Sequence, residues 1–260
     1  MVHLLDIRVL KFSFVILMLG LRTNATAANF DPSTFINATN NLISELGAFV
    51  GLAADLRAYE GAKPFSSDIG IDFGTSVSAV TVPAKVASAL SEIGIQNVPR
   101  YIPIPKVNIQ KSLPGNLMIG SEFIPTIKVR GYRLEAYGFN LQWTAIDRPR
   151  LPPIAIRAQY NYADLVLANA ATYGADLVVS HSILFVHMFA GAGYRYVNAN
   201  VANPTSTLPL NSNVSFDTSI DAGHFFAGTS LVAGFARITA EADFTTRNVN
   251  SYGTKLSFFF

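Results

Sequence analysis

The last ten residues of the chain, Ser251 to Phe260, read Ser-Tyr-Gly-Thr-Lys-Leu-Ser-Phe-Phe-Phe. Tyr, Thr, Leu, Phe and Phe share one parity in this stretch, while Gly, Lys and Ser share the other. Because the side chains of a β-strand point alternately to opposite faces, this pattern predicts a strand with lipid on one side and a wetter interior on the other. Lys255 is expected to face that interior, toward acidic residues such as Glu241 or Asp243.

A chain that ends on an aromatic residue at the close of such a strand resembles outer-membrane β-barrel proteins. Their C-terminal strand carries the signal that the barrel assembly machinery reads. The resemblance implies that Tyr252, Phe258 and Phe260 form this signal here. It also implies a bacterial outer-membrane location, with membrane lipid and the assembly machinery as partners.

The two-residue period recurs from Asp68 onward, in segments of about ten residues separated by turn signals, as in transmembrane barrels. The clearest segment is 154–162, in which Ile, Ala and Tyr residues alternate with Arg157, Gln159 and Asn161. We therefore predict an all-β transmembrane barrel of about ten antiparallel strands, within a range of eight to twelve. Eight strands would result if the Pro-rich segment 99–105 is not a strand.

An even number of strands places both chain ends on the periplasmic side, where such barrels have short turns, while the external loops are longer. The expected joins agree with this topology. The longest ones, Thr75 to Pro99 and Val201 to Asp221, fall on the external side, whereas Ser112 to Gly115 is a short periplasmic join.

The N-terminus reads as a secretory signal peptide over residues 1–27, because Arg8 and Lys11 precede an apolar run that ends before a small-x-small cleavage site. Cleavage is expected after Ala27 or Ala28. Residues 28–65 form the next segment, in which apolar positions at three- and four-residue spacing predict an amphipathic helix from about Pro32 to Tyr59. The helix is expected to cap the periplasmic base of the barrel, and a plug inside the lumen is the alternative. Residues 66–260 form the barrel.

A second, shorter helix is predicted from Ala84 to Ile93, inside the first long loop, with Val86, Leu90 and Ile93 on one side. This apolar face would be hidden by folding inward over the pore as a gate, or by packing on the external rim. Both arrangements are open at the level of the sequence.

Composition excludes several classes of protein. Hydrophobic residues make up 50% of the chain and charged residues 14%, yet no later stretch is apolar for 18 or more residues, so helical membrane spans are not expected. The absence of cysteine excludes disulfides, zinc–thiolate sites and cysteine catalysis. A net charge of +2 without a basic cluster gives no support for nucleic-acid binding.

Charged residues on the polar parity of the strands are candidates for the lining of the lumen. Their structural role would be mutual pairing inside a narrow barrel, and their functional role would be the selection of solutes. The candidates are Asp68, Asp72, Glu122, Arg157, Asp176, Arg237, Glu241, Asp243 and Lys255.

No catalytic, cofactor-binding or metal-binding residues are predicted. Asp72-Phe73-Gly74 matches a kinase triplet without the accompanying motifs, and Gly191-Ala192-Gly193 lacks the rest of a dinucleotide fingerprint. His181, His187 and His224 are not at metal-ligand spacing, and no serine is marked as a nucleophile. The protein is therefore not expected to be an enzyme.

Short motifs in the middle of the chain carry a further resemblance. Leu113-Pro114-Gly115-Asn116-Leu117, Gly120, Ile124-Pro125 and the segment Pro152-Pro153-Ile154-Ala155-Ile156-Arg157 resemble an uncharacterised family of bacterial outer-membrane barrels. That family is distantly similar to long-chain fatty-acid transport porins. Together, the resemblance and the strand pattern favour a narrow channel or transporter for small molecules, including hydrophobic ligands. The alternative is a structural or surface-interaction barrel without transport.

Overall fold

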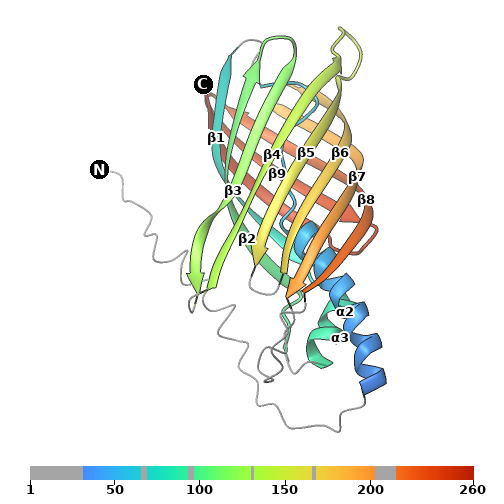
Figure 1. Ribbon diagram of the computed structural model, residues 1–260. Helices are drawn as coiled ribbons and strands as arrows, with labels where there is room; N and C mark the ends of the chain where they lie inside the picture. Colours follow the sequence, from blue (N-terminus) through green and yellow to red (C-terminus); the bar gives the residue numbers. More distant parts are fainter. Residues whose placement is uncertain (1–31, 66–68, 93–96, 130–131, 166–167, 203–214) are drawn as a thin grey trace, which may run out of the picture.

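The computed structural model describes residues 32–65, 69–92, 97–129, 132–165, 168–202 and 215–260. Ten antiparallel strands form one closed barrel in which β1 pairs with β10 (Figure 1). The strands are β1 Gly70–Thr81, β2 Tyr101–Leu113, β3 Leu117–Val129, β4 Tyr132–Ile146, β5 Ile154–Leu165, β6 Ala168–Ile183, β7 Val186–Ala202, β8 Ser215–Ala233, β9 Ala236–Thr245 and β10 Ser251–Phe259. The prediction of an all-β barrel with ten strands is confirmed.

The Pro-containing segment is a strand of the barrel, so the eight-stranded alternative is wrong. β2 pairs with β1 from Tyr101 to Ser112, including Pro103 and Pro105. Its pairing with β3 begins only at Val107. Because proline has no N–H to donate, it is tolerated where a strand has a neighbour on one side only. Both prolines lie in that part of β2.

The outer face of the barrel is apolar. Phe73 and Val77 on β1, Leu177 on β6 and Leu256 on β10 are about half exposed, while the residues between them on each strand point inward. Strands that alternate in this way present an apolar band to the bilayer and keep polar groups inside. Among the described residues, no helix is both long and apolar enough to cross a membrane.

The two ends of the barrel differ in their connections. Short turns join β2 to β3, β4 to β5, β6 to β7 and β8 to β9 at the end where β1 begins and β10 ends. The longer joins, 82–100 and 203–214, lie at the opposite end. The other joins at that end, 130–131, 166–167 and 246–250, are short, so the orientation rests on the two long loops. By the usual rule for such barrels, the end that carries the longest loops is external and the opposite end is periplasmic.

Both long loops are shorter than the sequence suggested. β1 continues through Ser76 and Ser78 to Thr81, and β7 and β8 extend the barrel wall to Ala202 and from Ser215. The small polar residues that resemble a loop in the sequence are the inward positions of these strands, for example Ser76 and Ser78, which are buried.

Helix α2, Pro32–Ala53, lies at the external end of the barrel, with its last turns inside the mouth (Figure 1). Gly47 and Gly51 face the wall there: a Cβ on Gly47 would lie 2.8 Å from that of Ala199, and one on Gly51 would overlap Val197. The expected cap at the periplasmic base is therefore wrong. The helix also ends earlier than the expected Tyr59, because the chain leaves helical geometry after Ala53 and enters the lumen.

The helix in the first loop is confirmed as α3, Ala84–Glu92. Val86 is buried in a cluster with Leu46 of α2 and Val82, and Phe49 of α2 packs against this cluster. Lys85 forms an ion pair of 3.5 Å with Glu45 of α2. The apolar face of α3, at Val86, is thus covered by α2 at the external mouth. Ile93, expected at the end of this helix, lies outside the described residues.

Candidate functional site

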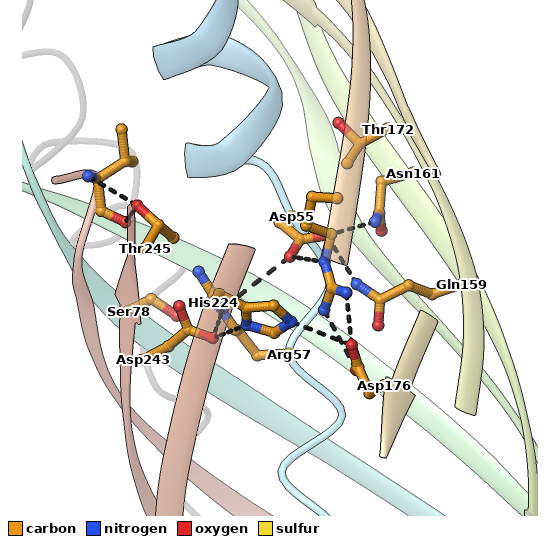
Figure 2. Close-up of polar contacts among 12 residues, drawn as sticks. Asp55, Arg57, Ser78, Gln159, Asn161, Thr172, Asp176, His224, Asp243 and Thr245 are labelled. Carbon is orange, nitrogen blue, oxygen red and sulfur yellow. Dashed lines mark hydrogen bonds and ion pairs between the residues drawn. The ribbon is translucent and has the colours of Figure 1, made fainter. Parts of the chain in front are cut away.

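The lumen contains a stretch of the chain itself. Residues Ala54–Ala62, called the strap here, have no regular secondary structure and are buried, apart from the half-buried Gly61. At about 3.3 Å per residue, nine residues reach up to about 30 Å, comparable with the apolar thickness of a bilayer. The strap runs from the end of α2 at the external mouth toward the periplasmic end, where β1 begins (Figures 1 and 2).

Side chains of the wall hydrogen-bond to the backbone of the strap. Lys106 on β2 donates to the carbonyl of Asp55 at 2.6 Å, and Gln110 donates to that of Ala58 at 2.6 Å. Arg157 on β5 donates to the carbonyl of Glu60 at 2.8 Å.

The periplasmic end of the strap is held in the same way. The N–H of Ala62 donates to Ser180 at 3.1 Å, and Thr144 donates to the Ala62 carbonyl at 2.5 Å. A buried irregular segment needs such partners, because its own backbone groups have no ladder to join.

Asp55 is the centre of the polar cluster nearest the external mouth (Figure 2). Arg195 on β7 donates through Nε to Asp55 Oδ2 at 2.7 Å, and through Nη1 to Asp176 Oδ1 on β6 at 2.5 Å. Gln159 and Asn161 on β5 donate to the other oxygen of Asp55, at 2.8 and 2.7 Å. One carboxylate of the strap is therefore bound by three side chains from two strands.

His224 on β8 lies beside this cluster (Figure 2). Its Nδ1 is 2.7 Å from Asp243 Oδ2, and its Nε2 is 3.0 Å from Asp176 Oδ1. Because both partners are carboxylates, both ring nitrogens donate when the imidazole is protonated. Asp243 also forms an ion pair with Arg57 of the strap.

A second group of charges lies toward the periplasmic end. Glu60 of the strap forms an ion pair with Arg237 on β9 and lies 3.4 Å from Lys255 on β10. Lys255 is 2.7 Å from Asp72 on β1, so these contacts link the two strands that close the barrel. The partners of Lys255 are thus Asp72 and Glu60, and the expected partners, Glu241 and Asp243, were wrong.

A third pair, Lys106 on β2 and Glu122 on β3, lies 2.6 Å apart, and Glu122 also accepts the backbone N–H of Arg57 at 3.3 Å. In the described part of the chain, the buried charges then balance. They comprise seven carboxylates and six Lys or Arg side chains, with His224 as a seventh basic group. Among the contacts of the described residues, each of these groups except Arg157 and Glu241 has an oppositely charged partner within 4 Å, with His224 counted as protonated. Such pairing is the condition under which ionic groups are tolerated away from water.

Eight of the nine lining candidates lie buried in the interior: Asp72, Glu122, Arg157, Asp176, Arg237, Glu241, Asp243 and Lys255. Asp68 lies outside the described residues. The outward-facing parity of the last strand holds Tyr252, Phe258 and Phe260, which are exposed.

The sequence reasoning missed Asp55, Arg57 and Glu60 on the strap, and Lys106 and Arg195 on the wall. For Arg195 a signal existed, because it alternates with Tyr194 and Tyr196, both of which are exposed. No comparable signal marks the strap, because its partners come from strands that lie far away in the sequence.

The motifs set aside in the sequence have structural positions. Asp72, Phe73 and Gly74 alternate between the interior and the outer face of β1. His187 lies near the periplasmic turn, with Nδ1 2.7 Å from Ser182. Within the described ranges, no set of His, Asp and Glu side chains is arranged to hold a metal ion.

No known protein family matches the sequence, and no curated protein matches it. Solved structures with a similar arrangement include the outer-membrane protease OmpT of Escherichia coli, with 10% identity and a TM-score of 0.41 over 78% of this chain and 100% of that one. The translocator domain of the autotransporter NalP of Neisseria meningitidis has 8% identity and a TM-score of 0.41, over 86% and 96%. The N-terminal β-barrel domain of Pseudomonas aeruginosa OprF has 10% identity and a TM-score of 0.38, over 75% and 100%.

The location follows from the barrel itself. Closed barrels satisfy every strand edge, which makes them one of the two structures that can span a bilayer. The band of exposed Phe, Leu, Ile and Val around a charged interior is the arrangement of bacterial outer-membrane barrels. The protein is an outer-membrane β-barrel protein.

Proposed function

We propose that this outer-membrane barrel is a closed surface anchor, which holds its N-terminal helix at the external face and does not pass solutes in this state. The single observation that carries the proposal is the strap, which fills the lumen and is bound by wall residues from its external to its periplasmic end. Of the two roles that the sequence allows, the strap favours the structural or surface-interaction barrel.

The position of α2 supports a surface role. The helix packs on the external mouth with α3, and Lys85 of α3 is 81% exposed at the same end. A partner outside the cell would therefore meet α2 and α3 first. Outward Tyr252, Phe258 and Phe260 remain the proposed signal for the barrel assembly machinery, and the apolar band is the proposed contact with membrane lipid.

The proposed role is not enzymatic. In the described part of the chain, both ring nitrogens of His224 contact carboxylates, and neither contacts a serine or threonine hydroxyl that it would activate. The side chain is surrounded by ion pairs, which suits a structural function.

Cysteine labelling tests the orientation of the helix, because the natural chain has no cysteine. Ser44→Cys places a thiol on α2, and Leu184→Cys places one in the turn between β6 and β7, where Leu184 is 88% exposed. With a membrane-impermeant maleimide, we expect labelling of Ser44→Cys on intact cells and of Leu184→Cys only after the outer membrane is permeabilised. The reverse pattern would overturn the proposed surface display.

Planar bilayers test whether the lumen is closed. The full chain is expected to give no steady conductance, and a stable open pore formed by it would refute the closed state.

A narrow channel, the other candidate, is favoured by one observation: the wall behind the strap is polar along its length, as at Lys106, Gln142 and Arg237. It would require the strap to leave the lumen. If so, neutralising the strap with Asp55→Asn, Arg57→Gln and Glu60→Gln would produce conductance or uptake of small hydrophobic molecules. Such conductance or uptake would support transport.

A further inference from the structure

The outer face of the barrel carries a groove near the external end, across β5, β6, β7 and β8. Its volume is about 450 Å³, within the range of roughly 300–1,000 Å³ in which small-molecule sites fall. The lining includes Tyr162, Asn169, Tyr196 and Asn198, together with Asp217 on β8. These side chains belong to the outward-facing parity of their strands, so the groove opens sideways from the barrel and not into the lumen.

Strand register explains why the wall is hollow there. Tyr162, Ala171, Asn198 and Ser219 lie directly opposite one another on the four strands. The Ala171 methyl group is the smallest side chain of this row and stands between a tyrosine and an asparagine. It leaves a gap on the surface, with Ala171 as its floor.

The rows above and below give the groove two different edges. On the external side, Asn169, Asn200 and Asp217 lie in register, and Asn200 Nδ2 donates to Asp217 Oδ1 at 2.7 Å. On the membrane side, Tyr173 lies opposite Tyr196, which is 39% exposed. One edge therefore offers amide and carboxylate groups, and the other offers aromatic rings.

This combination selects a class of ligand. Amides both donate and accept hydrogen bonds, and a carboxylate accepts them from hydroxyl groups. Tyrosine adds an apolar ring face and a hydroxyl group. Within the described chain, no Lys or Arg lines the groove, and Asp217 adds a negative charge, so a phosphate group would lack the cation that usually binds it. A neutral ring rich in hydroxyl groups can hydrogen-bond to the amide and carboxylate groups of one edge and pack against the aromatic rings of the other.

The height of the groove indicates where such a ring would come from. Tyrosines gather where a barrel wall passes from the apolar band to the headgroups of the lipid. The row formed by Tyr160, Tyr173 and Tyr196 marks this level on the external side. We propose that the groove binds the neutral saccharide headgroup of a lipid in the external leaflet. The proposal goes beyond the surface-anchor role and depends on the orientation of the barrel, not on the closed lumen.

The full chain, folded into phosphatidylcholine nanodiscs that also contain galactosyl diacylglycerol and phosphatidylglycerol in equal amounts, provides the test. Native mass spectrometry then counts the lipids that stay bound after release into detergent. We expect galactosyl diacylglycerol to be retained over both other lipids. Preferential retention of phosphatidylglycerol, or no preference, would overturn the proposal.

Two variants should abolish the preference in different ways. Ala171→Phe fills the floor of the groove and leaves every polar group in place, while Asn198→Leu removes one amide at a position that faces outward. Each is expected to lower the retained galactosyl diacylglycerol about tenfold: Asn198→Leu through the loss of one or two good hydrogen bonds, and Ala171→Phe because its ring occupies the space of the sugar. Unchanged retention in both folded variants would refute the site.

Ala175→Phe is the matched control, because Ala175 is an exposed outward residue of the same strand, nearer the periplasmic end and outside the groove. It should retain the lipid as the natural chain does. Titration with free galactose separates the two sources of the sugar: no binding is expected at millimolar concentration, and binding as tight as that of the lipid would overturn the assignment to a membrane headgroup.

Discussion

Arg195 joins the strap to the wall, because its guanidinium contacts Asp55 on the strap and Asp176 on β6. All three side chains are almost fully buried. A carboxylate in such a place depends on its cation, since removing one partner of a buried pair leaves the other charge without water or counter-charge. The stability of the strap is therefore concentrated in a few side chains.

Arg195→Met should consequently destabilise the protein by about 3–5 kcal/mol, the usual effect of breaking a buried ion pair. Unfolding by urea in lipid vesicles, followed by the gel shift between folded and unfolded barrel, measures the change. Arg148→Met, in the exposed turn after β4, is the matched control and should change stability by less than about 0.5 kcal/mol. Equal effects of both changes would show that Arg195 is not a structural link.

Lys255 and Asp72 provide a prediction about coupling at the seam between β1 and β10. Lys255→Met alone removes a cation that both Asp72 and Glu60 contact. In the double variant, Asp72→Asn also removes one of the two carboxylates that have lost this partner. The double variant should be more stable than the sum of the single variants predicts, by roughly 0.5–3 kcal/mol. A double-mutant cycle measured by urea unfolding decides this, and strict additivity would contradict the pair.

At the scale of elements, α2 and the strap act as one inserted unit. The last turns of the helix fit the wall because Gly47 and Gly51 present no side chain there. The strap then continues from Ala54, with Tyr59 at φ 53° and its hydroxyl 2.7 Å from that of Ser78. Gly253 on β10 leaves room for the Tyr59 ring, since a Cβ at this position would overlap the phenol.

Gly51→Leu should therefore expel the end of α2 and expose the strap. Arg57, which is buried, becomes a trypsin site when the strap leaves the lumen. We expect cleavage at Arg57 to be much faster in this variant than in the natural chain, as measured by mass spectrometry of the released fragment. Gly223→Ala is the control, because its methyl group would lie at an ordinary distance of 3.5 Å from Thr246. Cleavage that is no faster than in this control would refute the insertion.

The strands were predictable, and the strap was not, for one physical reason. The alternation of outward and inward side chains along a strand such as β5 is a property of adjacent residues. The sequence around Ile156 and Arg157 therefore suffices to assign the first to the outer face and the second to the interior. The apolar spacing that predicts α2 continues through Leu56, which is buried in the lumen as part of the strap and not of the helix. Asp55 and Arg195 are 140 residues apart, and only the closed barrel brings them together.

For the whole molecule, the contrast between the apolar outside and the charged inside decides stability in the membrane. Leu177 on β6 is 57% exposed and lies near mid-height of its strand, whereas Leu184 follows in the periplasmic turn. Leu177→Arg should destabilise the folded barrel by about 2–4 kcal/mol, and Leu184→Arg by about 0–1 kcal/mol, because charge is penalised most at the bilayer midplane. Urea unfolding in vesicles measures both, and equal effects would place the membrane elsewhere on the barrel.

The path of the strap also has a mechanical consequence. A pulling force applied to α2 from outside the cell is transmitted down the lumen toward the first residue of β1, and it meets Asp55, Arg57 and Glu60 in sequence, each held by the wall. The force is thus divided among ion pairs to several strands of the wall before any strand separates from its neighbour. Pulling on the external end of α2 must therefore break these ion pairs one after another before the strap can leave the lumen.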